Sequence, residues 1–95
     1  MEIESLRRKR AEIISIAKRN GGRKVRIFGS LARGDSGMDS DVDFLIELEP
    51  GRSLLDIIAI KQNLEDLLQR KVDVVTESAV SPYIRKEIMR QAISL

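Results

Sequence analysis

The chain contains no cysteine and no histidine. Their absence excludes a disulfide framework, thiolate catalysis, a Ser-His-Asp triad and zinc sites with the usual ligands. Any metal ion must therefore be held by oxygen atoms. Oxygen ligands select hard cations, of which magnesium, manganese and calcium are the realistic choices.

Aromatic residues and long apolar runs are also scarce. Only Phe28, Phe44 and Tyr83 are aromatic, which disfavours nucleic-acid binding by base stacking. No apolar run approaches the length of a membrane span, and the amino terminus is charged where a signal peptide would be apolar. We therefore expect a cytoplasmic protein. The length of 95 residues predicts one domain, residues 1–95.

Positive charge is concentrated near the start of the chain. The first 26 residues carry nine Lys or Arg against three Asp or Glu, and the rest carry eight against twelve. A solvated basic helix face is the simpler interpretation. A surface that attracts a polyphosphate, a nucleic acid or an acidic partner is the alternative.

The hydrophobic periodicity predicts alternating helices and strands. We expect a helix over residues 2–20, a strand over 24–28, a short helix over 30–33 capped by Ser30, a loop over 34–40, a strand over 41–48, a helix starting after Ser53, a strand over 71–76 and a helix starting at Pro82. The long helix should bury Leu54, Ile57, Ile60, Leu64, Leu67 and Leu68, and the last should share one apolar side of Ile84, Ile88 and Ala92.

This order of elements predicts an α+β domain of two layers. Three strands would form the sheet, with the helices packed mainly on one face. The helices have enough apolar residues to cover only that face well. We expect the other face, which carries acidic side chains, to be open to a ligand.

Two of these acidic residues, Asp41 and Asp43, lie two apart in the most hydrophobic strand. Their side chains should leave the same face, with Cα atoms roughly 6 to 7 Å apart. Two carboxylates about 5 Å apart repel by roughly 3 kcal/mol at an effective dielectric near 20, and a divalent cation reverses that cost. Aspartate is depleted in strands, so the pair indicates a functional site.

Asp73 is a third acidic residue within a strand, flanked by Val72 and Val74. If its strand lies beside that of Asp41 and Asp43, the three carboxylates form a cup suited to two hard cations about 3.5 to 4 Å apart. The alternative is a strand-end residue bonded to a backbone amide or paired with Lys71.

Gly29 and Ser30 follow the first predicted strand and open a short helix. Such a turn presents backbone amides and a hydroxyl to one point, which suits a phosphate group. Taken alone, the pair is a commonplace turn with a helix cap. Its significance depends on the aspartates that follow it.

The run GSLARGDSGMDSDVDF, residues 29–44, places ten residues between Ser30 and Asp41. It resembles the glycine-serine and double-aspartate signature of the DNA polymerase beta-like nucleotidyltransferase superfamily. Within that superfamily, Ala32-Arg33-Gly34-Asp35 and Ser40 are similar to the minimal nucleotidyltransferases, or MNT proteins. The order of elements also resembles that family from end to end, with Asp73 where its third carboxylate is expected.

This resemblance implies a nucleotidyltransferase fold with a mixed three-stranded sheet, ATP as substrate and two magnesium ions. Ser30 and the Gly29 amide would hold the terminal phosphates. Asp41 and Asp43 would bind both ions, and Asp73 would serve as a ligand and a candidate base for the acceptor hydroxyl.

Two more residues enter the expected nucleotide site through the resemblance. Ser40 precedes the aspartates, and Arg33 either fixes the loop, contacts a phosphate or faces solvent. Family members of this size pair with helical HEPN-domain proteins as antitoxin and toxin, and can transfer AMP to a tyrosine of the toxin.

We therefore expect a magnesium-dependent enzyme that transfers AMP from ATP to a partner's hydroxyl. No second domain follows the third strand to hold the acceptor, which favours a protein partner or self-association. Three alternatives remain: an antitoxin that acts by contact without turnover, a glycosyltransferase whose Asp-x-Asp binds a nucleotide sugar, and nucleic-acid binding through Arg7, Arg8 and Arg10.

Overall fold

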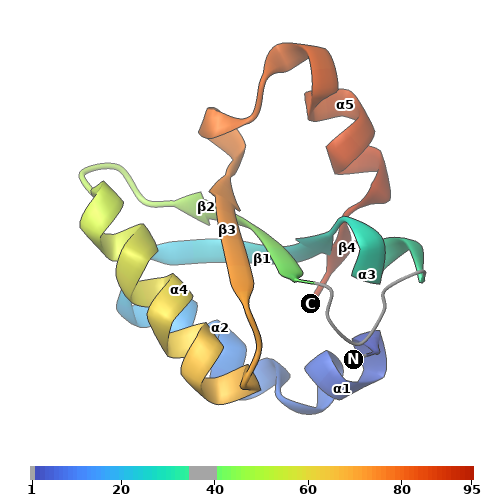
Figure 1. The fold of residues 1–95 in the computed structure, drawn as a ribbon. Helices are drawn as coiled ribbons and strands as arrows, with labels where there is room; N and C mark the ends of the chain where they lie inside the picture. The colour runs from blue at the N-terminus through green and yellow to red at the C-terminus, as the bar shows by residue number, and fades with distance from the viewer. Residues whose placement is uncertain (1, 35–40) are drawn as a thin grey trace.

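The computed structural model describes residues 2–34 and 41–95. Within them a four-stranded sheet has the order β3-β2-β1-β4 (Figure 1). The elements are α1 Ile3–Arg8, α2 Arg10–Arg19, β1 Gly22–Phe28, α3 Ser30–Arg33, β2 Val42–Leu48, α4 Leu54–Leu68, β3 Val72–Thr76, the short 3-10 helix η1 Glu77–Ala79, α5 Pro82–Gln91 and β4 Ile93–Ser94.

The predicted mixed sheet is confirmed. β2 runs antiparallel to β1 and parallel to β3. The expectation of three strands was one too few, because β4 pairs antiparallel with β1 at Arg26 and Ile27. β4 has only two residues, too few to show an alternating pattern, and it exists through its pairing with β1.

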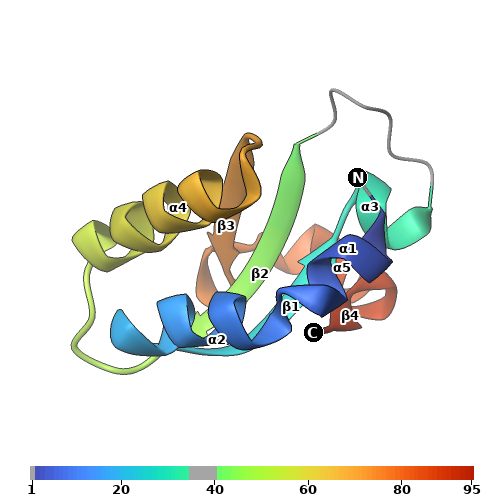
Figure 2. The same ribbon diagram turned by 90° about the horizontal axis from the view of Figure 1, so that it is seen from below.

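The main core lies between the sheet and the helices α2 and α4, which cover the same face (Figures 1 and 2). β2 supplies Val42, Phe44 and Ile46 to this core, as its alternation predicts. Ile13, Ile16, Ala17, Ile60, Leu64 and Leu68 enter it from the two helices. Full burial of one such side chain contributes roughly 1.5 to 3 kcal/mol. This layer fixes the position of β2.

The predicted buried stripe of α4 begins later than expected. Leu54 is 69% exposed, so its assignment to the core was wrong. The first turn of α4 lies beyond the region where the helix packs on the sheet, and full burial begins at Ile60. The capping box was predicted correctly, since Ser53 Oγ accepts from the Leu55 amide and Asp56 accepts from the Ser53 amide.

The first predicted helix, residues 2–20, is broken at Lys9 into α1 and α2. Lys9 has φ −102° and ψ 14°, outside the helical geometry of its neighbours. Leu6 before the break and Ile13 after it are both fully buried. The bend keeps both side chains on the core.

The last predicted helix is present, but it lies on the opposite side of the sheet from α2 and α4 (Figure 1). It begins at Pro82, and Ser81 Oγ accepts from the Tyr83 amide. Ile84 and Ile88 lie four residues apart in α5 and so share one side as expected, but the placement of Ala92 is wrong, because it lies beyond the end of α5 in extended conformation. No residue of α5 is buried. α5 projects outward where no other described element packs along its length.

The acidic face of the sheet is also less open than expected. Leu45, which lies on that face, is fully buried, and Val80, which follows η1, is only 6% exposed. Both lie outside the main core cluster. The chain after β3 therefore covers part of this face and leaves the starts of β2 and β3 uncovered.

Candidate active site

Asp43 and Asp73 are direct cross-strand partners in the parallel pairing of β2 with β3. Neighbouring strands lie about 4.8 Å apart, and residues directly opposite each other point to the same face. The two carboxylates therefore leave the same side of the sheet at the start of the two strands. The expected adjacency of these two strands is present in the structure.

Gly29 lies immediately beside Asp43. β1 pairs Phe28 with Asp43, and Gly29 then turns the chain with φ 76° and ψ −151°. A Cβ atom on residue 29 would stand 2.2 Å from Asp43 Oδ2. Only glycine combines this positive φ with such close approach of a carboxylate.

The negative charges of the neighbouring acidic residues act on the carboxyl group of Asp43. The pKa of its carboxyl is raised above 3.8, first by burial and then by the negative charges of Asp73 and Asp41, while the Arg33 guanidinium lowers it. Asp43 is half-buried, whereas Asp41 and Asp73 are exposed. An ionised Asp43 is therefore held in a place that favours a compensating cation.

Ser30 is the first residue of α3, directly after the turn. The predicted cap is wrong in detail, because Gly29 occupies the N-cap position and no side chain caps this helix. Gly29 instead accepts a backbone bond from the Arg33 amide at 3.1 Å. The Ser30 hydroxyl is thus not engaged as a cap and lies one residue from the Asp43 contact.

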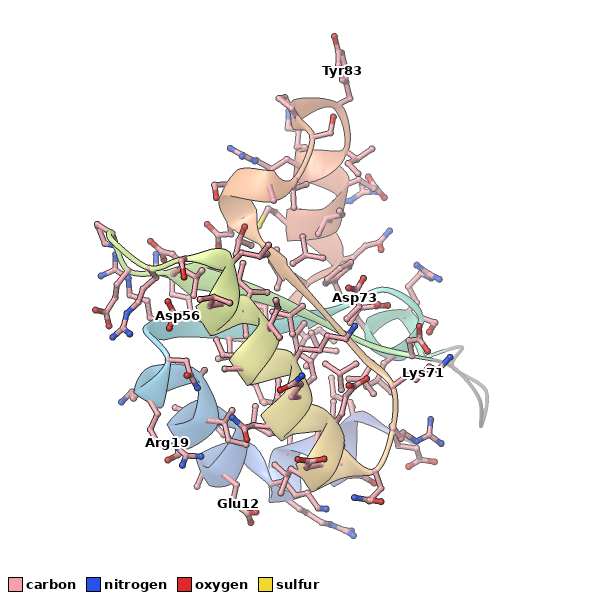
Figure 3. All side chains as sticks on the ribbon, turned by 60° about the vertical axis from the view of Figure 1, so that its left-hand side comes forward. Glu12, Arg19, Asp56, Lys71, Asp73 and Tyr83 are labelled. Carbon is pink, nitrogen blue, oxygen red and sulfur yellow. The ribbon has the colours of Figure 1, made fainter. Side chains whose placement is uncertain are left out.

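The alternative reading of Asp73 finds no support in the described ranges. There its side chain forms neither an ion pair with Lys71 nor a hydrogen bond with a backbone amide; Figure 3 labels both side chains near the start of β3. Ser40, expected in the nucleotide site, lies outside the described residues. Arg33 is exposed, and its positive charge lowers the pKa of Asp43.

The carboxylate oxygens of this site are suitable ligands for a hard cation. Among residues 2–34 and 41–95, no group of three or more Asp or Glu side chains is gathered closely enough to form a complete metal cage. The structure forms the Asp43–Asp73 pair, and Asp41 precedes β2 directly after residues 35–40. An all-oxygen donor set whose charges raise the pKa of Asp43 suits magnesium.

Residues 10–95 match the family model described as a nucleotidyltransferase domain. The chain belongs to this nucleotidyltransferase family. Two relatives are similar over most of their length. A protein of Methanocaldococcus jannaschii, provisionally named a protein adenylyltransferase, is 37% identical over 100% of this chain and 99% of its own. The protein adenylyltransferase MntA of Thermococcus cleftensis is 38% identical over 82% of this chain and 79% of its own.

Solved structures agree with the nucleotidyltransferase fold. One described provisionally as a minimal nucleotidyltransferase has a TM-score of 0.90 and 44% identity, covering 100% of this chain and 97% of its own. A toxin–antitoxin crystal structure with AMP-PNP has a TM-score of 0.75, 21% identity and coverage of 88% and 69%. A complex of tri-AMPylated Shewanella oneidensis HEPN toxin with MNT antitoxin has 0.66, 19%, 88% and 66%. The last two support the fold alone.

Sequence reasoning missed what bounds the acidic face of this nucleotidyltransferase. Arg26 lies opposite Leu45 and forms an ion pair with Glu77 of η1. This ion pair connects the chain after β3 to β1, two residue pairs along the sheet from the pairing of Phe28 with Asp43. Leu45, an apolar residue among the acids of its face, was the available signal that this part of the face is covered.

The nucleotidyltransferase has no described helix, in residues 2–34 or 41–95, with the length and apolar character needed to cross a membrane.

Proposed function

We propose that this nucleotidyltransferase is a magnesium-dependent protein adenylyltransferase that transfers AMP from ATP to a tyrosine hydroxyl of a HEPN-type toxin, and so acts as its antitoxin. The observation that carries the proposal is the pairing of Asp43 with Asp73 beside the Gly29 turn. A paired carboxylate site next to a glycine-serine turn suits a nucleoside triphosphate with its metal.

The triphosphate would be held at the turn. The Gly29 amide and the Ser30 hydroxyl would bind its terminal phosphates, because Gly29 leaves its backbone uncovered by a side chain and Ser30 does not cap α3. Asp41, Asp43 and Asp73 would hold magnesium. When bound, the ion supplies positive charge that neutralises the phosphate oxygens.

The reaction forms one bond and breaks one. The acceptor oxygen bonds to the α-phosphorus of ATP as the bond from that phosphorus to the bridging oxygen breaks, and pyrophosphate leaves. Asp73 is the candidate acceptor of the hydroxyl proton, since its side chain is exposed while Asp43 is half-buried. Asp43 is held in place by contact with Gly29 and orients the site.

The choice of AMP and of a protein acceptor is supported by the relatives. Two of them, similar over at least 79% of their own length, are named protein adenylyltransferases. Structural neighbours include an AMP-PNP complex and an AMPylated HEPN toxin bound to its MNT antitoxin. A tyrosine phenol, with a pKa near 10, is easier for a carboxylate to activate than an aliphatic alcohol.

The test is transfer of label from ATP labelled at the α-phosphate to a HEPN-domain protein of the same genome. We expect labelling that requires magnesium and falls by about 1,000-fold in the double variant Asp41→Ala, Asp43→Ala. Asp66→Ala, an exposed acidic residue of α4, is the matched control and should label normally. Undiminished labelling by the double variant would refute the assignment.

A cell assay separates catalysis from neutralisation by contact. A variant with Asp41, Asp43 and Asp73 changed to alanine should still be expressed and folded but should fail to protect cells that produce the toxin. Full protection by this variant would mean that contact suffices and that the adenylyl transfer proposed here is not how the protein neutralises its partner.

A further inference from the structure

The single tyrosine of this chain stands at the outer end of α5. Tyr83 is 96% exposed, and Figure 3 shows it at the tip of the projecting α5 region, away from Asp73. No hydrogen bond engages its hydroxyl within residues 2–34 and 41–95. The phenol of Tyr83 is therefore exposed to solvent at the outer end of α5.

Few contacts hold α5, and they lie behind its tip. Arg85 donates to the carbonyl oxygen of Glu77 at 2.9 Å, and Arg26 contacts Met89 Sδ at 3.7 Å. Ser81 Oγ and Pro82 fix the start of the helix. These contacts hold the start of α5 in position, and the hydroxyl of Tyr83 in its first turn stays accessible.

An exposed tyrosine alone is unremarkable in a soluble domain, but this chain carries a site suited to modifying one. We propose that Tyr83 is itself an acceptor of AMP, modified in trans by the active site of a second copy of the chain. This inference rests on the proposed adenylyltransferase function and adds an acceptor on the enzyme.

Transfer within one copy is disfavoured by the topology. Asp73 is the second residue of β3, and Thr76 ends that strand roughly 10 Å further on at 3.3 Å per residue. η1 and then α5 follow, with Tyr83 on the outer end (Figure 3). The α5 contacts of Arg85 and Met89 hold the tip away from the site of its own copy.

The start of α5, which carries Tyr83, and the acidic site have opposite charge, and both are accessible to a second copy. Asp41 and Asp73 are exposed, so the starts of β2 and β3 can receive a protruding group. Lys86, also exposed, lies three residues after Tyr83 and therefore on the same side of α5, and the acidic Glu87 beside it is paired with Arg90. Its positive charge would approach an acidic site carrying a triphosphate, which favours this docking over a random encounter.

The chemistry balances without a further reactant. The phenol oxygen of Tyr83 bonds to the α-phosphorus of ATP, the bond to the bridging oxygen breaks, and pyrophosphate leaves. The phenol proton passes to the exposed Asp73 carboxylate of the acting copy and then to water. The product is an adenylyl-tyrosine phosphodiester on the second copy.

The experiment mixes two differently tagged forms of the full chain with magnesium and ATP labelled at the α-phosphate. The acting form carries Tyr83→Phe, and the accepting form carries Asp41→Ala with Asp43→Ala and keeps Tyr83. We expect label on the accepting form alone, mapped to Tyr83 by mass spectrometry. Adding Tyr83→Phe to the accepting form should lower its labelling at least 10-fold, and Ser78→Ala, an exposed hydroxyl near α5, should not.

The outcomes separate this inference from the proposed function. If the accepting form stays unlabelled while the Tyr83→Phe form labels the HEPN-domain protein, Tyr83 is not an acceptor and the adenylyltransferase assignment stands. Label that appears only on wild-type chains, at a rate per chain independent of concentration, means transfer in cis and overturns the inference. Failure to label either protein overturns both proposals.

Discussion

The carboxylate of Asp43 lies against the α-carbon of Gly29. A side chain on residue 29 would place its Cβ 2.2 Å from Asp43 Oδ2 and 3.2 Å from its Cγ. The turn that would hold phosphate and the strand that would hold metal are therefore in direct contact. The position of the carboxylate depends on the absence of a side chain at residue 29.

Gly29→Ala should displace Asp43 and impair catalysis. The substitution adds a clash and forces alanine into a positive φ, which costs about 1 to 2 kcal/mol. A displacement of about 1 Å at a reacting centre lowers the rate by roughly 100-fold. The measurements are kcat for AMP transfer and the free energy of unfolding.

Gly51→Ala is the matched control for Gly29→Ala. Gly51 has φ +87°, and no atom lies within 4 Å of a Cβ placed there. It should lose about 1 kcal/mol of stability through the same backbone strain while keeping its kcat. Equal losses of kcat in the two variants would show that strain, and not the contact with Asp43, explains the defect.

Asp43→Asn should stabilise the metal-free protein at neutral pH. The folded state raises the pKa of Asp43 above 3.8, so it disfavours the ionised carboxylate relative to the unfolded chain. The ionised group therefore destabilises the fold above the raised pKa, and this penalty disappears as pH falls through that pKa toward 3.8. Removing this penalty should raise the Tm of the variant above that of the wild type, by about 4 to 8 °C for each 1 kcal/mol of stability gained.

Thermal melts in EDTA at pH 8 and near pH 4 check this sign. The advantage of Asp43→Asn should be present at pH 8 and shrink near pH 4. Addition of magnesium at pH 8 should raise the Tm of the wild type more than that of the variant. An Asp43→Asn protein less stable than the wild type in EDTA at pH 8 would contradict the electrostatic account.

Ser30→Ala should weaken ATP binding. Loss of a hydrogen bond to a charged phosphate costs about 1.5 to 3 kcal/mol, which raises KM for ATP roughly 10-fold to 100-fold. Stability should be unchanged, because Ser30 does not cap α3. Steady-state kinetics checks this, with Ser15→Ala, a change at an exposed residue of α2, as control. An unchanged KM would remove Ser30 from the phosphate site.

Asp73→Asn should lower kcat by at least 100-fold, because the variant loses the proposed proton acceptor. The fold should stay intact, because the Asp73 side chain is exposed and forms no ion pair or hydrogen bond with a described residue. Asp66→Asn, also exposed, is the control and should keep full activity. A wild-type kcat in Asp73→Asn would leave Asp73 as an ordinary surface residue of β3.

Local sequence signals predicted the elements whose geometry they control directly. The alternation of β2, the capping box of Ser53 and Asp56, and the start of α5 at Pro82 all appear where expected. Each follows from side-chain periodicity or from a bond within a few residues of the chain.

Features that depend on distant contacts could not be predicted in this way. β4 exists only through its pairing with β1, and the break at Lys9 follows the shape of the core. The alignment of Asp43 with Asp73 depends on strand register, and a shift of one residue would send Asp73 to the other face. The sequence placed both residues in strands but could not set that register.

The most direct test of the account is a crystal structure of the protein with manganese and an ATP analogue that cannot be cleaved at the α-phosphate. We predict an anomalous manganese peak bound by Asp43 and Asp73, with Asp41 as a third ligand and the terminal phosphates at Gly29 and Ser30. A triphosphate bound elsewhere, or manganese that leaves Asp43 and Asp73 without a metal between them, would contradict the assignment.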